Sequence, residues 1–187
     1  NHMSNLLVQN IKHTNGTTAQ TIDSTGRVTN PNCPAWSVYF YNDGTGGSDG
    51  SGGDGVGAGS GSAVTILWNR ESVDTGNSYN TSTGQYTVPV TGVYLVSLKL
   101  LGAADAGGGA QSVNVQLQKS TDSGTNFSSL DIFYNQLDGS GGYPNSSSVV
   151  IHSFNAGDIL RTQVMSGYIY VENSDNPYNR WSGFLIG

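Results

Sequence analysis

Hydrophobic and polar residues alternate with a period of two along most of this chain. The clearest example is the segment VNVQLQ, in which Val113, Val115 and Leu117 alternate with polar side chains. Such alternation is typical of a strand with one face in a core and the other in water. Almost no stretch shows the 3.6-residue period of an amphipathic helix. The pattern therefore predicts an all-β chain.

Short apolar or alternating segments, separated by turn signals, continue to the C-terminus. The expected strands cover residues 35–40, 63–69, 86–90, 93–101, 113–117, 130–136, 148–154, 159–166, 168–172 and 181–186. The sequence NAGD at residues 155–158 supplies one of the turns between them. Many short strands with regular turn signals are typical of a sandwich or jelly roll. We therefore expect a jelly-roll sandwich.

The N-terminal part of the chain differs from the rest. Residues 1–3 (NHM) read as the remnant of a removed tag followed by the natural start methionine. Residues 4–29 are polar and predict two weak strands around an Asn15-Gly16 turn. Two weak strands do not hold a fold alone, so this segment is expected to pack on something else or on its own copies.

A short linker and one larger unit follow. Residues 30–34 (NPNCP) predict a boundary, because two prolines remove backbone donors and stiffen the chain. Residues 35–187 are long enough to form a head with its own core. Within this head, residues 43–62 are nearly all Gly, Ser and Asp. A loop of that length is commonly functional or disordered.

Composition limits the possible partners. Of the 187 residues, 13 are acidic and 7 are basic, which gives a net charge of −6. Nucleic acid is not expected as a partner, because a phosphate backbone needs clustered Lys and Arg. No apolar run reaches the length of a membrane span, so membrane insertion is not expected, and no signal peptide is visible. The single cysteine, Cys33, has no intrachain disulfide partner.

The sequence offers little for catalysis. His13 lies in the N-terminal segment and His152 on an expected strand. Residues 46–50 fit G-x-S-x-G without the strand-to-helix turn that this motif requires, and residues 50–55 fit G-x-G-x-x-G without a following helix. We therefore predict that the protein is not an enzyme. The competing hypothesis, a glycan-degrading enzyme, requires two carboxylates facing each other across a cleft.

Metal binding is the better chemical candidate. Asp43, Asp49 and Asp54 lie on a glycine-rich backbone with many carbonyl oxygens. Ca²⁺ takes several oxygen ligands in irregular geometry, so such a loop could wrap one calcium ion. The alternative is a solvated loop without metal, and no cofactor is required by the sequence. No cluster of Cys and His suggests zinc.

Receptor binding is expected in the loops. Residues 43–62, 105–110 and 138–145 are glycine-rich, polar and bear aspartates. Recognition is commonly built on loops that a rigid scaffold carries, and an aromatic ring beside polar groups suits a sugar ring. The candidate receptor-binding residues are Asp105, Asp138, Tyr143, Asp175, Asn176 and Tyr178.

Two motifs in the head resemble a known family. The stretch YNTSTGQYTVPVTGVYLVSL at residues 79–98 and the closing WSGFLIG at residues 181–187 resemble the globular head of complement component C1q, within the TNF-like jelly rolls. The resemblance covers roughly residues 35–187, and the glycine-rich insertion is its clearest departure. It implies a non-enzymatic binding module that forms homotrimers. Several members bind calcium near the trimer axis, but their ligands cannot be transferred to this sequence.

The resemblance also suggests which aromatic residues pack and which form the interface. Trp181, Tyr94 and Phe184 lie on strands inside the family motifs and are assigned to packing. Amphipathic side chains commonly line such interfaces, and the candidates for the trimer interface are Tyr39, Tyr94, Tyr168 and Tyr170.

The N-terminal segment carries a second resemblance. Its sequence NIKHTNGTTAQTIDSTGRV is similar to a segment of many bacteriophage virion structural proteins and tail-fibre subunits. This similarity implies that residues 4–29 attach the subunit to other virion proteins or trimerise it. Together the two resemblances imply a trimeric fibre or adhesin head at the phage particle surface, which binds a host-surface glycan or protein receptor. The alternative is a purely structural capsid decoration or fibre cap.

Overall fold

The computed structural model describes residues 8–30, 32–40, 55–59, 62–102, 112–136, 145–170 and 177–187, without the side chains of 55–59, 135 and 136. The chain divides into two compact units, Asn1–Cys33 and Pro34–Gly187. The described residues form strands, turns and bends, and no helix among them is long and apolar enough to cross a membrane. The all-β prediction is therefore confirmed for the described part of the chain.

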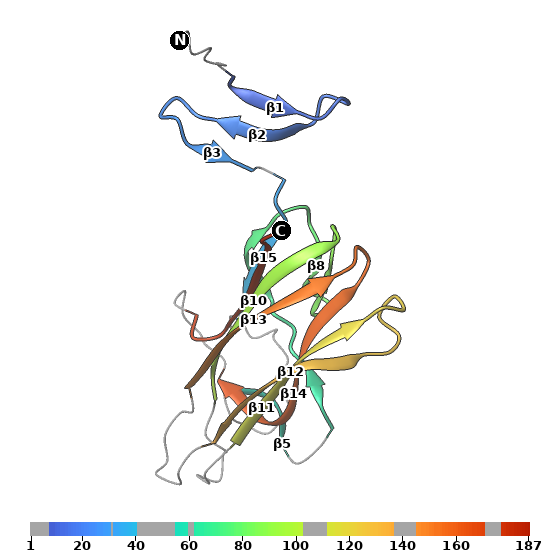
Figure 1. Ribbon diagram of the computed structural model, residues 1–187. Coiled ribbons are helices and arrows are strands. Elements are labelled where there is room, and N and C mark those ends of the chain that lie inside the picture. The colour runs from blue at the N-terminus through green and yellow to red at the C-terminus, as the bar shows by residue number, and fades with distance from the viewer. Residues whose placement is uncertain are drawn as a thin grey trace. The chain divides into compact units, whose positions relative to one another are not determined.

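The N-terminal unit is a three-stranded antiparallel sheet (Figure 1). Its strands β1 (Asn10–Lys12), β2 (Thr18–Ile22) and β3 (Val28–Thr29) follow one another in space as in sequence. The third strand was not expected from the sequence. The β2–β3 turn is held by Asp23, whose carboxylate accepts hydrogen bonds from the backbone amides of Thr25 and Arg27.

The apolar side chains of this small sheet lie on one face. Ile11 pairs with Gln20, and Ile22, two residues further along β2, pairs with Val28. Alternation therefore places Ile11, Ile22 and Val28 on the same face. Ile11 and Val28 are 48% and 57% exposed, and none of residues 8–30 is buried. The described part of this unit therefore has no core of its own.

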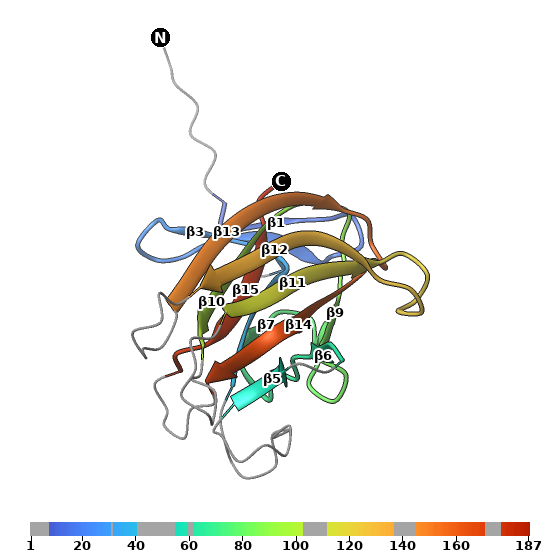
Figure 2. The ribbon, with the colours of Figure 1, turned by 90° about the horizontal axis from the view of Figure 1, so that it is seen from below.

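The second unit is a sandwich of two antiparallel sheets, and the jelly-roll prediction is confirmed. The five-stranded sheet has the order β13 (Asn145–Phe154), β10 (Gly92–Leu101), β15 (Arg180–Leu185), β4 (Ala35–Tyr39), β7 (Arg70–Asp74). The other sheet has the order β12 (Ser128–Gln136), β11 (Ser112–Ser120), β14 (Ile159–Tyr170), β9 (Gln85–Thr87), β8 (Tyr79–Asn80). Two further strands, β5 (Gly55–Gly59) and β6 (Val64–Thr65), pair with β14 and complete this seven-stranded sheet. Figure 2 shows β12, β11 and β14 side by side.

Three local predictions need correction. Residues 55–59, placed in a long loop, form β5, because backbone pairing with β14 needs no large side chains. Residues 159–166 and 168–172 were expected as two strands, but 159–170 is one strand that passes Gly167 with φ of 74°. The strand expected over 63–69 is only Val64–Thr65, and the charged segment Arg70–Asp74 forms β7 instead.

Aromatic rings from both sheets fill the centre of the sandwich. The ring of Trp36 stacks on Tyr86 of the opposite sheet at 3.9 Å, and Trp181 meets Trp36 edge-on at 5.5 Å. Tyr94 is 0% exposed and its hydroxyl donates to the Val90 carbonyl at 2.7 Å. The assignment of Tyr94 to the trimer interface is therefore wrong, because its side chain lies in the core of one subunit.

A buried hydrogen bond in this core leads to a testable prediction. The indole N–H of Trp68 donates to the hydroxyl of Thr162 at 2.9 Å, and both residues are 0% exposed. Thr162→Val keeps the shape but leaves the indole without an acceptor, so we expect the free energy of unfolding to fall by about 1–3 kcal/mol. Thr162→Ser, which keeps the hydroxyl, should lower the free energy of unfolding by less than Thr162→Val does. Urea denaturation of the three proteins measures the difference, and equal values for valine and wild type would contradict it.

Candidate functional site

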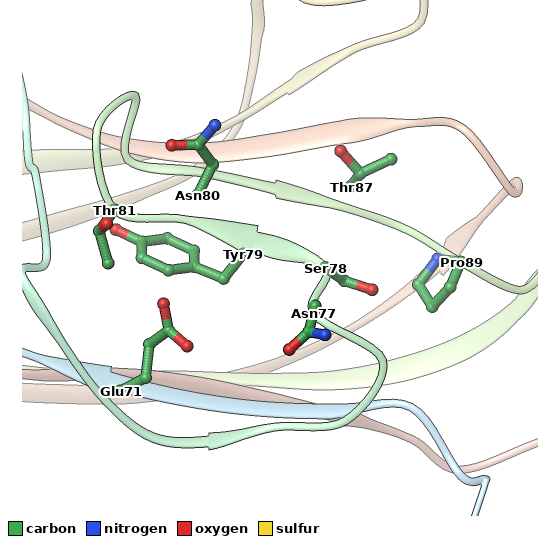
Figure 3. A pocket seen from close by; sticks show the side chains of 8 residues that line it. All are labelled: Glu71, Asn77, Ser78, Tyr79, Asn80, Thr81, Thr87 and Pro89. Atoms are coloured by element: carbon green, nitrogen blue, oxygen red, sulfur yellow. The ribbon is translucent and has the colours of Figure 1, made fainter.

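A polar cavity lies at one edge of the sandwich, between β7 of the five-stranded sheet and β8 of the seven-stranded sheet (Figure 3). Its volume is about 540 Å³. The lining residues come from β7, from the β7–β8 turn, and from β8 and the chain that follows it. They are Glu71, Asn77, Ser78, Tyr79, Asn80, Thr81, Thr87 and Pro89.

The turn that lines this cavity is fixed by one carboxylate. Asp74 accepts hydrogen bonds from the backbone amides of Ser78 and Tyr79, each at 3.0 Å. Gly76 and Asn77 have φ of 92° and 53°, a left-handed conformation that glycine and asparagine tolerate well. Both oxygens of Asp74 are thus used to hold the backbone, and the lining side chains are carried by an ordered turn.

The charge in the cavity is negative. Glu71 rises from β7 toward the ring of Tyr79 (Figure 3). Burial, and to a smaller extent the nearby Asp74 carboxylate, raise the pKa of Glu71. Burial also raises the pKa of Tyr79, partly offset by the backbone of Trp68 and reinforced by Glu71. The Tyr79 side chain is only 7% exposed, and its hydroxyl is closed off from the cavity and lies close to the backbone of Trp68.

A second surface lies at the other edge, on the outer face of the five-stranded sheet. Leu95 pairs with Ile151 on one side and with Phe184 on the other, so these three side chains form one apolar row across β13, β10 and β15. Ile151 and Phe184 are 60% and 45% exposed, and Val149, two residues from Ile151, is 61% exposed. We call Leu95, Val149, Ile151 and Phe184 the apolar face. The assignment of Phe184 to packing therefore does not hold within one subunit.

The outer face of the seven-stranded sheet is different. Its central strands present amides and a guanidinium: Asn114, Gln116, Arg161 and Gln163. Arg161 donates to Gln118 at 2.8 Å and lies over the ring of Phe127 at 3.7 Å. Exposed apolar side chains occur at its β12 rim, where Ile132 and Tyr134 are 59% and 55% exposed. This rim adjoins β13, to which it is linked by a contact between Asp131 and His152. The exposed apolar surface thus continues from the apolar face around one edge.

The far end of the five-stranded sheet is basic. Lys99 pairs with Arg180, Arg180 with Tyr39, and Tyr39 with Arg70, in one cross-strand row. Arg180 donates to the hydroxyls of Ser37 and Ser72, each at 2.7 Å. This row contains three of the seven basic residues of the chain. The outer face therefore runs from apolar to basic along the strands.

Most residues predicted to bind a receptor or a metal lie outside the described residues. They are Asp105, Asp138, Tyr143, Asp175 and Asn176 for the receptor, and Asp43, Asp49 and Asp54 for calcium. Tyr178 is described, is 46% exposed, and packs edge-on against Tyr170 at 6.0 Å. Within the described part of the chain, no group of three or more His, Cys, Asp or Glu is arranged to hold a metal ion.

The residues that flank those segments come together at one end of the sandwich. Tyr39 pairs with Arg180, and Leu101 pairs with Asn145. Gly102 forms a bridge to Ile169. Four segments outside the described residues are therefore all joined to the sandwich at this one end. They are residues 41–54, 103–111, 137–144 and 171–176.

The three remaining interface candidates do not share one surface. Tyr39 lies on the outer face of the five-stranded sheet, in the basic row. Tyr168 and Tyr170 lie on β14 of the other sheet, and all three are half-buried. The apolar face was missed, although a signal was present. Consecutive apolar residues, such as Val149-Val150-Ile151, leave an apolar side chain on both faces of a strand.

The chain matches the C1q domain family over residues 57–186. It belongs to that family. Among curated proteins, none matches its sequence significantly.

Solved structures show the same fold for this C1q domain. The globular domain of zebrafish complement 1qA has 18% identity and a TM-score of 0.54, with 82% of this chain and 98% of that chain covered. Murine APRIL at pH 5.0 has 11% identity and a TM-score of 0.57, with coverage of 82% and 99%. Eiger TNF from S. frugiperda has 14% identity and a TM-score of 0.56, with coverage of 83% and 93%. At these identities the likeness shows the jelly-roll fold alone.

Proposed function

We propose that this protein is a non-enzymatic, trimeric binding head of a bacteriophage particle, of the fibre or adhesin type, that recognises the host surface. C1q domains commonly form trimers and bind receptors or other ligands. The observation that carries the proposal is the apolar face, with Val149, Ile151 and Phe184 exposed on one sheet.

The apolar face supports self-association. Contiguous exposed apolar patches on a soluble protein commonly mark an interaction surface. The apolar face lies on the outer surface of the five-stranded sheet, and the rim of Ile132 and Tyr134 lies on the outer surface of the seven-stranded sheet. The two surfaces adjoin at the edge formed by β13 and β12. A contact between one surface and a different surface of the next copy closes into a ring when the rotation fits. Three copies would then hide both surfaces.

The absence of a glycan-hydrolysing arrangement in the cavity supports a binding role. Hydrolysis needs two carboxylates on opposite sides of the bond. Among the described residues, Glu71 is the one carboxylate that lines the β7–β8 cavity. Both oxygens of the nearby Asp74 accept backbone hydrogen bonds. His152, the one histidine of the described head, contacts Asp131 and packs against Phe154 at 5.8 Å, a structural environment.

The virion assignment rests on the N-terminal segment. Its amino-acid sequence is similar to that of phage structural proteins. Its sheet has an apolar face, but none of residues 8–30 is buried. A unit of this size (Asn1–Cys33), whose described apolar side chains stay exposed, usually needs association with a partner to be stable. Residues 4–29 would obtain it from other virion proteins or from their own copies.

We expect receptor contact at the end of the sandwich where the residues that flank the predicted binding segments converge. Tyr178, exposed beside Tyr170, is the described residue that we expect to touch a host-surface glycan or protein. Three copies per trimer would turn weak single contacts into useful avidity. Calcium at Asp43, Asp49 and Asp54 would explain any dependence of binding on divalent ions.

Adsorption of the fluorescently labelled protein to host cells tests this function. Saturable binding to strains that the parent phage infects is the expected result, and loss of binding in EDTA would locate calcium at the aspartate-bearing segments. A purified trimer that binds neither cells nor any envelope glycan would contradict the adhesin function and leave the alternative, a capsid decoration or fibre cap.

A further inference from the structure

The β7–β8 cavity has the chemistry of a site for sugar hydroxyls. Its lining combines amides, hydroxyls and a carboxylate: Glu71, Asn77, Ser78, Asn80, Thr81 and Thr87. A carboxylate accepts two hydrogen bonds at once, and an amide offers both donors and an acceptor. A small number of such groups, beside an apolar ring such as that of Pro89, is what fixes the orientation of a small ligand.

The charge of the cavity selects against anionic ligands. None of the described residues that line the cavity is Lys or Arg. Glu71 lines the cavity, and Asp74 lies near enough to act on it. A ligand carboxylate, sulfate or phosphate would meet like charge without a compensating cation, which lowers affinity for that ligand class. Lys99 and Arg180, which could attract such ligands, lie on the outer face of the five-stranded sheet instead.

The site is ordered before any ligand binds. Asp74 fixes the backbone at Ser78 and Tyr79, and the Thr87 amide donates to the Ser78 carbonyl at 2.8 Å. The side-chain oxygen of Asn80 accepts from the Ser82 amide at 2.9 Å, which orients its NH₂ group. Groups that are already held in place lose little freedom on binding, so weak polar contacts can yield measurable affinity.

We propose that the β7–β8 cavity binds an uncharged saccharide, with the Glu71 carboxylate accepting hydrogen bonds from two neighbouring sugar hydroxyls. The proposal rests on the proposed host-glycan recognition, since it names the place and the chemical class of the glycan. β7 and β8 are the edge strands opposite β13 and β12, so the apolar face can be covered in a trimer while the cavity stays open.

The test uses the full chain and paired neutral and acidic oligosaccharides. The neutral set ends in glucose, galactose, mannose or N-acetylglucosamine, and the acidic set carries uronic or sialic acid on the same backbones. Glu71→Ala should weaken binding of the neutral sugar at least about tenfold. The affinity of Glu71→Gln should lie between those of the wild type and Glu71→Ala. Lys99→Ala, an exposed position on the outer face of the five-stranded sheet and away from the cavity, should leave this binding unchanged. Thermal unfolding and light scattering of each variant confirm that fold and assembly are intact, as expected for the exposed Glu71.

Each outcome separates this site from the wider function. Binding of a neutral sugar that is lost in Glu71→Ala and kept in Lys99→Ala supports the cavity. Sugar or cell binding that is unchanged in Glu71→Ala but lost in Tyr178→Ala overturns the cavity and leaves the adhesin function standing. Binding of acidic sugars in preference to neutral ones also overturns it. A trimer that binds neither sugars nor cells contradicts both the cavity proposal and the proposed adhesin function.

Discussion

Gly183→Ala is expected to destabilise the head by about 3 kcal/mol or more, enough to prevent normal folding in many preparations. Gly183 is buried on β15, and an added Cβ would lie 2.2 Å, 2.5 Å and 2.6 Å from three atoms of the Trp36 ring. Trp36 cannot move aside, because its ring is stacked on Tyr86 and met edge-on by Trp181. The glycine of the closing WSGFL motif is therefore required by packing. Urea denaturation, or the soluble yield if the variant does not fold, measures the effect.

Gly187→Ala is the matched control, because an added Cβ there meets nothing within 4 Å. It should leave the unfolding midpoint unchanged. Shrinking the opposing ring should recover part of the loss, so Gly183→Ala with Trp36→Phe is expected to be more stable than the sum of the two single effects predicts. A Gly183→Ala protein as stable as wild type would show that the packing of Trp36 is described wrongly.

Ile151→Asp is expected to convert the trimer to monomers at micromolar concentration while leaving the head folded. Ile151 is 60% exposed in one subunit, so its replacement disturbs no core. In the proposed trimer the same side chain is covered, together with its row partners Leu95 and Phe184. A carboxylate covered there without a partner costs several kcal/mol in each of three contacts, since its hydration is lost. Light scattering reports the mass and circular dichroism the fold.

Gln163→Asp controls for the added charge. Gln163 lies on β14, two strands away from the β12 rim and outside the two surfaces that the proposed assembly brings together. This variant should keep the wild-type mass. If Ile151→Asp also keeps it, the apolar face is not the association surface, whatever the oligomeric state.

The strands with alternating or apolar sequence could be predicted from the sequence. The segment VNVQLQ lies within β11 with Val113, Val115 and Leu117 buried, as its alternation indicates. The strand β7 was missed because its sequence RESVD is charged. It is an edge strand, and edge strands tolerate charge on the side that faces water. The strand β5 was missed because glycines can pair through the backbone while giving no side-chain signal.

The candidate site could not be predicted because it joins segments through long-range pairing. Glu71 lies on the edge of one sheet and Tyr79 on the edge of the other. The motif that begins YNTSTGQYTVP was recognised as a family signature, yet Tyr79, Asn80, Thr81, Thr87 and Pro89 within it also line the cavity. Similarly, the four interface tyrosines were chosen as amphipathic residues, whereas exposure in the folded chain points to the aliphatic row of Ile151 and Leu95 and to Phe184.

The central claim is that three copies associate through the apolar face, and the most direct test is the mass of the unmodified protein in solution. Light scattering at micromolar concentration should give three times the chain mass of 19.6 kDa. A mass of 19.6 kDa that persists as the concentration is raised would contradict the account, because Val149, Ile151 and Phe184 would then remain exposed in solution.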